Sequence, residues 1–200
     1  AALNLNENLH IILVGKENII KKFLPEHGKE GRISICPCEE VIAMDEHPAI
    51  AYRKKKDASI SVATRLVKEQ KADAVVSAGS TGAQMVAALF GLGRIPGIDR
   101  PAIGTLIPTL AGSKLLLDAG ANADCKPENL VQFALMGSIY ANKILGYARP
   151  RVGLVNIGEE PSKGNELTLQ AYDLLSKVTE LNFIGNIEGR DILAGKADVM

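Results

Sequence analysis

Residues 71–84 read KADAVVSAGSTGAQ, and the fold that we expect follows from this stretch. Val75 and Val76 end a short apolar run that is typical of a buried strand, and a turn of small residues follows them. Beyond the turn, apolar residues recur with the spacing of one helical face, at Met85, Ala88, Leu89 and Leu92. A strand, a short turn and a helix in this order indicate an α/β protein.

The turn at 77–82 is a candidate phosphate site. Because it precedes a helix, its free backbone N–H groups lie at the positive end of the helix dipole, where anions bind. Gly79 and Gly82 let the backbone approach a ligand, and Ser80 or Thr81 can cap the helix or donate to the anion. The alternative is a tight connection with a Ser or Thr cap and no ligand.

Composition narrows the class of protein. The 200 residues carry 23 basic and 23 acidic side chains, so no overall positive field favours nucleic acid. Apolar residues make up 46%, enough for a substantial core, and no apolar run approaches the roughly 18 residues of a membrane span. Three cysteines, an odd number, favour reduced thiols and the cytoplasm. Cys36-Pro37-Cys38 lacks a second ligand pair, so we expect no metal site.

Apolar runs alternate with amphipathic stretches along the chain. Strands are expected at 9–14, 32–36, 102–107, 114–117, 151–155 and 182–184, and the pattern of 71–75 returns at 196–200. Helices are expected at 18–24, 48–56, 58–69, 127–145 and 165–177. The short connection between 107 and 114 predicts a hairpin. The pattern indicates a mainly parallel sheet covered on both faces, in one α/β domain over residues 1–200.

Polar residues gather where these strands end, which is where a parallel sheet binds its ligands. Asp118 and Asn122 follow the strand at 114–117, Asn156 and Lys163 follow the strand at 151–155, and Asn186 follows the strand at 182–184. Lys163 also precedes a helix N-terminus, where a cation is unfavourable unless an anion shares the site. We expect these loops and the turn at 77–82 to converge on one cleft.

Six segments carry a resemblance to a known family: RKKK at 53–56, SAGSTGA at 77–83, GRIPGIDRPA at 93–102, LLDAGAN at 116–122, KGNEL at 163–167 and NFIGNIEGRD at 182–191. In this order they resemble the PlsX family, the bacterial phosphate acyltransferases of phospholipid synthesis. The resemblance covers essentially the whole chain. Long matches in one order are far more specific than a single glycine-rich turn.

The resemblance implies a homodimeric enzyme with a three-layer α/β fold, similar to isocitrate and isopropylmalate dehydrogenases and to phosphate acetyltransferases. Such an enzyme transfers a fatty acyl group from acyl carrier protein to inorganic phosphate and makes acyl phosphate, and no cofactor is expected. The family begins with an extra strand bearing Asp-Ala-Met-Gly-Gly-Asp and continues beyond the position of Met200. We therefore expect a sequence truncated at both ends, with peripheral membrane association coming from segments outside it.

The reaction brings a phosphate oxygen to a thioester carbonyl, so positioning and electrostatic stabilisation can suffice without a covalent enzyme intermediate. The resemblance places Lys163 in the active site, and we expect Lys163, Asn165 and Asn186 to act in catalysis. Residues expected to bind phosphate or substrate are Gly79, Ser80, Thr81, Gly82, Asp118, Asn122 and Asn156. The alternative for Lys163 is an exposed lysine at a helix end.

Other roles stay open. Cys125 precedes a helix and could be a nucleophile, but direct transfer does not need one and an inert thiol is favoured. The basic residues Arg53, Lys54 and Lys55 form either a solvated helix face or a docking site for the acidic carrier protein.

Competing functions are an enzyme that uses coenzyme A thioesters, a dehydrogenase of related fold, and a non-catalytic module that binds phosphate or acyl ligands. No G-x-G-x-x-G follows a strand and no G-x-x-x-x-G-K-[ST] occurs, which weakens a nucleotide-binding interpretation.

Overall fold

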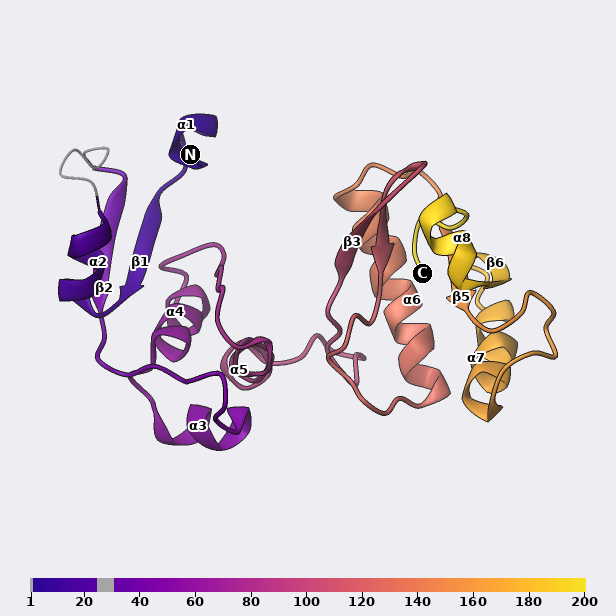
Figure 1. The fold of residues 1–200 in the computed structure, drawn as a ribbon, viewed down its shortest axis with the longest axis horizontal. Helices are drawn as coiled ribbons and strands as arrows, with labels where there is room; N and C mark the ends of the chain where they lie inside the picture. The colour runs from indigo at the N-terminus through magenta and orange to yellow at the C-terminus, as the bar shows by residue number, and fades with distance from the viewer. Residues whose placement is uncertain (1, 25–30) are drawn as a thin grey trace. The chain divides into compact units, whose positions relative to one another are not determined.

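The chain folds into helices and short strands in the computed structural model, which describes residues 2–24 and 31–200 (Figure 1). Contacts among the residues divide the chain into two units, residues 1–94 and 95–200. The single domain expected over residues 1–200 stays a prediction.

The first unit holds one pair of strands and a group of helices. Strand β1 (Ile11–Gly15) pairs in parallel with β2 (Ile33–Pro37), and helix α2 (Glu17–Phe23) packs against both. The remaining elements are α1 (Ala2–Leu5), α3 (Pro48–Lys54), α4 (Ser59–Lys68), α5 (Thr81–Ala87) and the π-helix η1 (Ala88–Leu92). The expected strands near 9–14 and 32–36 and the expected helices at 18–24, 48–56 and 58–69 are confirmed.

The strand expected to end at Val75 and Val76 is wrong. The segment 74–79 forms no strand, and the Val76 side chain is 95% exposed. An extended segment becomes a strand only when another strand supplies its backbone partners, and in the described part of this unit β1 pairs only with β2. The helix after the turn is confirmed as α5, but Ala83 and Ala87 are its buried residues, while Leu92 beyond it is exposed.

The second unit is built on two pairs of strands. Strands β3 (Thr105–Thr109) and β4 (Gly112–Leu116) form the expected antiparallel hairpin, and β5 (Arg151–Val155) pairs in parallel with β6 (Asn182–Ile187). The helices are α6 (Pro127–Lys143), α7 (Glu166–Ser176) and α8 (Gly189–Ala194). The sequence predicted all of these except α8, where no helix was expected.

Residues 198–200 join the two strand pairs. Val199 bridges in parallel to Leu115 of β4 and to Val152 of β5. The Leu115 N–H donates to the Asp198 carbonyl at 3.0 Å, and the Gly153 N–H donates to the Val199 carbonyl at 2.9 Å. The segment that was expected to form a strand therefore lies between β4 and β5, in the middle of the sheet.

The sheet of the second unit is covered on both faces. Leu115 and Val199 pack into a core with residues of α6 and α7, such as Ala134 and Leu175. The neighbours of Leu115 and Val199 in sequence, Leu116 and Met200, pack instead with Ile192 of α8. Because side chains alternate between the two faces of a strand, α6 and α7 lie on one face and α8 on the other. This is the expected three-layer α/β arrangement.

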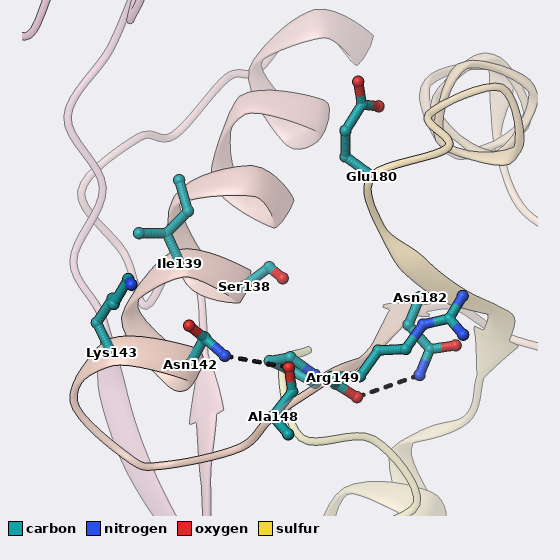
Figure 2. Close-up of a pocket in the computed structure, with 9 residues that line it drawn as sticks. Ser138, Ile139, Asn142, Lys143, Ala148, Arg149, Glu180 and Asn182 are labelled. Carbon is teal, nitrogen blue, oxygen red and sulfur yellow. Dashed lines mark hydrogen bonds between the residues drawn. The ribbon is translucent and has the colours of Figure 1, made fainter.

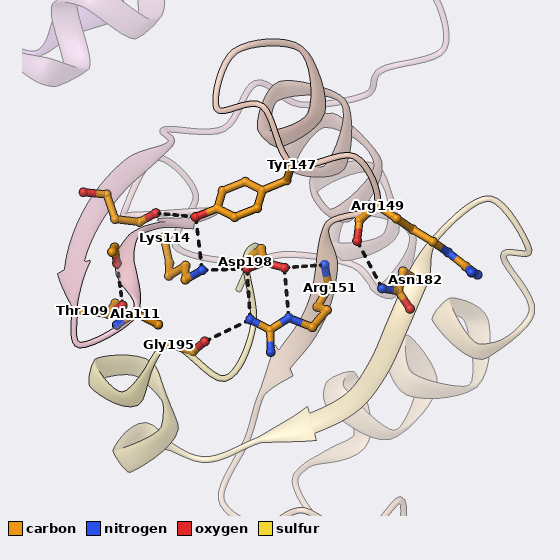
Figure 3. A network of polar contacts seen from close by, with 11 residues as sticks. Thr109, Ala111, Lys114, Tyr147, Arg149, Arg151, Asn182, Gly195 and Asp198 are labelled. Atoms are coloured by element: carbon orange, nitrogen blue, oxygen red, sulfur yellow. Dashed lines mark hydrogen bonds and ion pairs between the residues drawn. The ribbon is translucent and has the colours of Figure 1, made fainter.

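A buried group of charges supports the middle of this sheet (Figure 3). The Asp198 carboxylate accepts from Lys114 Nζ at 2.7 Å and from Arg151 Nε at 3.0 Å, and Lys114 also donates to the Tyr147 hydroxyl at 3.1 Å. Lys114 is only 3% exposed. Burial alone would raise the pKa of Asp198, but the hydrogen bonds from Arg151 and Lys114 outweigh it and hold this pKa well below its usual range.

We expect Asp198→Asn to lower the free energy of unfolding by about 3–5 kcal/mol at pH 7, because the buried ammonium of Lys114 loses its counter-charge. Urea unfolding measures the loss. As control, Asp173→Asn breaks an exposed pair with Lys177 and should change stability by less than about 1 kcal/mol. Equal effects of the two substitutions would contradict a special role for Asp198.

The same carboxylate predicts a pH dependence. Because the pKa of Asp198 is lower in the folded state than in the unfolded state, its stabilisation is present above about pH 4 and is lost as the pH falls below that value. The stability difference between the wild-type protein and the Asp198→Asn variant should therefore shrink as the pH is lowered from about 5 to about 2. Urea unfolding across this range tests the direction.

Candidate functional site

Three loops of the second unit leave the same edge of the sheet. Strands β4, β5 and β6 and the bridge at Val199 all run parallel, so their carboxyl ends lie together. The loop that begins at Asp118, the loop at 156–165 and the start of α8 follow these ends. That these three leave one edge of the sheet is confirmed, whereas a cleft formed by them stays a prediction. The turn at 77–82 belongs to the first unit, and its convergence with them stays a prediction.

The loop after β5 fixes the backbone of Lys163. Its first residue, Asn156, continues the ladder by donating its N–H to the Ile187 carbonyl at 2.8 Å. The Asn156 side chain then donates to the Lys163 carbonyl at 3.0 Å, and the Lys163 N–H donates to the Glu160 carbonyl at 3.1 Å. Both backbone polar groups of Lys163 are therefore held, while its side chain is exposed and forms no ion pair with the described residues.

Asn186 of β6 reaches the same loop from inside the sheet. It is 4% exposed, and its Nδ2 donates to the Glu160 carbonyl at 2.9 Å. Its Oδ1 is buried and has no hydrogen-bond partner among the residues that the structure describes. Asn186 was expected to follow the strand, but it lies within β6. The Glu160 carbonyl that it contacts also accepts from the Lys163 N–H, and a catalytic role of Asn186 stays a prediction.

The next residues form the start of α7. Asn165 caps this helix, since its side-chain oxygen accepts from the Thr168 N–H at 3.0 Å. Within the described chain, the N–H groups of Glu166 and Leu167 in the same turn have no hydrogen-bond partner. These two N–H groups and the positive end of the helix dipole are suited to an anion.

Gly164 permits this close arrangement. Its φ is +102°, a backbone conformation that residues with a side chain rarely adopt. A Cβ there would lie 2.5 Å from Asn156 Oδ1 and would also clash with Thr168 Oγ1. The glycine is therefore required both by backbone conformation and by space.

Ion pairs of Lys196 connect the loop at 156–165 to α8. Lys196 Nζ lies 2.6 Å from Glu159 and 3.3 Å from Asp191. Asp191 in turn accepts from the Glu188 N–H at 2.9 Å and so caps α8, a helix that the sequence analysis missed. The sequence signals for α8 are an acidic residue at each end of its capping turn, at 188 and 191, and Gly195 directly after the helix, in the left-handed conformation.

The side chains of Asp118 and Asn122 form hydrogen bonds that order their own loop. The Asp118 carboxylate accepts from the backbone N–H groups of Ile103, Ala121 and Asn122 and from Asn122 Nδ2, at 2.7 to 3.1 Å. Burial raises the pKa of Asp118, but these hydrogen bonds outweigh it and lower the pKa below its ordinary value. Asn122 also donates to the Pro101 carbonyl at 2.8 Å. The arrangement orders the loop, and a direct role of either residue in substrate binding stays a prediction.

The turn at 77–82 has the geometry of a capped connection. Ser80 accepts from the Ala83 N–H at 3.3 Å and caps α5, and the Ser77 hydroxyl accepts from the Gly79 N–H at 3.2 Å. A Cβ at Gly82 would lie 2.8 Å from Pro48 Cγ, so this glycine lets α5 approach α3. Thr81 begins the helix. These contacts account for Ser80 and Gly82 without a ligand, and a phosphate at this turn stays a prediction.

The basic side chains at 53–56, which continue from the end of α3 into the next residues, differ in their contacts. Lys55 is paired with Glu46 at 2.6 Å and also donates to the Val41 carbonyl. Arg53 lies over the Phe90 ring at 5.8 Å, and Lys56 lies over the Tyr52 ring at 5.2 Å. Lys54 is exposed and forms no ion pair with the described residues. Arg53 and Lys54 are therefore the members of the expected docking site that remain available to an acidic partner.

Cys125 and Cys38 do not have the environment of an activated nucleophile. Burial raises the pKa of Cys125, and the nearby Asp118 carboxylate raises it further, whereas a catalytic thiolate needs a lowered pKa. The pKa of Cys38 is likewise raised by burial. Within the described residues, no three His, Cys, Asp or Glu side chains come together as a metal site requires.

A small hollow lies at the opposite edge of the sheet (Figure 2). Its volume is about 230 Å³, and it opens beside the amino ends of β5 and β6, where Asn182 donates to the Arg149 carbonyl at 3.3 Å. The lining residues are Ser138, Ile139, Asn142, Lys143, Ala148, Arg149, Pro150, Glu180 and Asn182. Because it lies away from the carboxyl ends of the strands, this hollow is separate from the loop that carries Lys163.

The whole chain, residues 1–200, matches the family described as "Fatty acid synthesis protein". The chain belongs to this family. It is 63% identical to the phosphate acyltransferase of Heliobacterium modesticaldum over 203 residues, which cover 100% of this chain and 60% of that protein. It is 64% identical over 190 residues to the phosphate acyltransferase of Desulfitobacterium hafniense, covering 95% and 56% of the two chains. The chain thus spans about three fifths of the length of these relatives, and the resemblance to the PlsX family is confirmed.

A solved structure supports the fold of this family member. The crystal structure of a branched-chain phosphotransacylase from Enterococcus faecalis matches 99% of this chain and 70% of its own, with a TM-score of 0.55 and 16% identity. At that identity the match concerns the fold alone, and it confirms the α/β class. In the described ranges, none of the helices combines the length and apolar character that crossing a bilayer requires.

We expect Gly164→Ala to be more damaging than Gly146→Ala. Both glycines have positive φ, but a Cβ at Gly146 meets nothing within 4 Å. The control should therefore lose about 1 kcal/mol of unfolding free energy from backbone strain, and Gly164→Ala about 1–3 kcal/mol more from the clash with Asn156 and Thr168. Urea unfolding of the two variants measures the difference, and equal losses would show that the space at Gly164 is not limiting.

Proposed function

We propose that the protein is a phosphate acyltransferase, which transfers a fatty acyl group from acyl carrier protein to inorganic phosphate in phospholipid synthesis. The observation that carries the proposal is the match over the whole chain to a fatty acid synthesis family, with relatives named phosphate acyltransferase at 54–64% identity. The loop at 156–165 supplies the matching chemistry, a free cation beside an open helix N-terminus.

The proposed reaction forms one bond and breaks one. A phosphate oxygen attacks the thioester carbonyl carbon, the C–O bond forms, and negative charge develops on the carbonyl oxygen. The C–S bond then breaks, and the carrier thiolate leaves and takes up a proton from solvent. Lys163 and the N–H groups of Glu166 and Leu167 offset charge on the phosphate or on the carbonyl oxygen, and their fixed backbone reduces the cost of orientation.

The remaining roles complete this proposal. Asn165 shapes the helix start, Asn156 holds the Lys163 carbonyl, and the turn at 77–82 is a second place for phosphate. From the family resemblance we further propose a cytoplasmic homodimer without a cofactor, which associates peripherally with the membrane through segments outside residues 1–200. The acidic carrier protein would dock on α3 at Arg53 and Lys54, where its charge is complementary.

Lys163→Ala should reduce phosphate-dependent release of carrier thiol by about a hundredfold or more, because an electrostatic donor at the reacting group is typically worth that much. The assay uses a long-chain acyl carrier substrate and a polypeptide of the relatives' full length. Lys177→Ala, at the other end of α7, removes an exposed lysine paired with Asp173 and should retain the rate. Loss of activity in both variants, or in neither, would count against Lys163.

The same assay separates the competing functions. Faster turnover of acyl coenzyme A than of the acyl carrier substrate would indicate an enzyme of the coenzyme A type. Saturable binding of substrate without any thiol release would indicate a binding module and would refute the proposed reaction.

Replacing both Arg53 and Lys54 by Glu should weaken carrier binding about tenfold or more at low salt. The effect should be smaller at high salt, because salt screens the attraction between the charges. Lys22→Glu with Lys68→Glu makes the same change of charge elsewhere in the first unit and is the control. Titration of the acyl carrier against each variant gives the affinities. Equal weakening by both pairs would assign the effect to net charge rather than to α3.

A further inference from the structure

The carbonyl of Glu160 connects Asn186 to Lys163. It accepts from Asn186 Nδ2 at 2.9 Å and from the Lys163 N–H at 3.1 Å. Asn186, at one end of this connection, is 4% exposed and lies within the sheet, whereas Lys163, at the other end, has an exposed side chain. On its other side, the Lys163 backbone is held by Asn156, whose Nδ2 donates to the Lys163 carbonyl at 3.0 Å.

The local environment does not explain why position 186 holds an asparagine. Its Oδ1 is buried and lacks a partner among the described residues, which disfavours the folded state. Its pairing partner in β5, Leu154, packs against the apolar cluster that contains Val152 and Leu175, so the part of the sheet around Asn186 is apolar. A leucine of similar size would bury apolar surface at this position and leave no acceptor unsatisfied. Among the described residues, the Nδ2 donation to Glu160 is the one interaction that distinguishes asparagine from leucine at this position.

We propose that Asn186 is a positioning residue, which holds the backbone of Lys163 through the Glu160 carbonyl and so directs the lysine side chain. The inference rests on the proposed function for its effect on turnover, but the tether itself is a property of the loop. Asn186 does not touch the substrate in this account, so its contribution passes entirely through Lys163. It therefore differs from Asn165, whose side chain caps α7 directly.

Asn186→Leu separates positioning from support of the fold. A merely structural asparagine would lower the melting temperature when replaced, whereas here the melting temperature should stay within about 2 °C of the wild type or rise, because the unsatisfied acceptor is removed. Hydrogen exchange should accelerate by about tenfold or more in the peptide covering 157–164, while β5 and β6 keep their protection. A fall in melting temperature with exchange rising throughout the second unit would overturn the proposal.

Turnover provides the second test. Asn186→Leu should lower the rate of phosphate-dependent thiol release by about tenfold or more, since a small misplacement of a reacting group is costly. In the Lys163→Ala background the same substitution should change the rate by less than about twofold, because the residue it positions is already absent. Losses that multiply would mean that Asn186 contacts the substrate itself, and would overturn the proposal.

Asn182→Leu is the matched control. Asn182 begins the same strand, and its Nδ2 also donates to a loop carbonyl, that of Arg149, at 3.3 Å. This variant should leave both exchange at 157–164 and turnover unchanged, and equal effects of the two substitutions would overturn the proposal. If the wild-type protein releases no thiol, the proposed function fails, while hydrogen exchange still decides whether Asn186 tethers the loop.

Discussion

The buried contact of Asp198 with Lys114 and Arg151 is the interaction on which the second unit depends. Asp198 belongs to the segment that lies between β4 and β5, and its two cationic partners come from these two strands. The carboxylate therefore ties three neighbouring segments at the middle of the sheet. Such a group is costly to bury, and it is stable only because every charge has a partner; removing one partner costs about 3–5 kcal/mol. The helices on both faces, and the loops at the sheet edge, rely on this continuity.

Loops at that edge use polar side chains in two different ways. The Asp118 carboxylate receives four hydrogen bonds from its own loop and from Ile103, so its polar groups are occupied. The loop that carries Lys163 is held instead through its backbone, by Asn156 and Asn186, and its lysine side chain is open. Each such hydrogen bond contributes only about 1 kcal/mol to stability, but together they fix the position of the lysine backbone, from which the side chain extends. A fixed backbone with a free cation suits recognition of an anion.

Several features of the site were predictable, because they depend on local sequence. The order of strand, polar loop and helix at 151–177 indicated that Lys163 precedes a helix N-terminus, and the structure has this arrangement. Pairing partners were not predictable from the same patterns. Lys55 looked like part of a uniform basic run, yet it is paired with Glu46, and Gly82 looked like part of a phosphate turn, yet it packs against Pro48. These contacts join residues distant in sequence, so no local pattern contains them.

By itself, the sequence determined the α/β class, most of the helices and strands, the hairpin of β3 and β4, and the presence of polar side chains after the strand ends. Local periodicity and turn chemistry suffice for these. Only the tertiary structure decided that Val75 and Val76 form no strand, that residues 198–200 lie in the middle of a sheet, and that Asn186 reaches the Lys163 loop through Glu160. Strand pairing and burial are set by partners far along the chain, and that is the physical reason for the division.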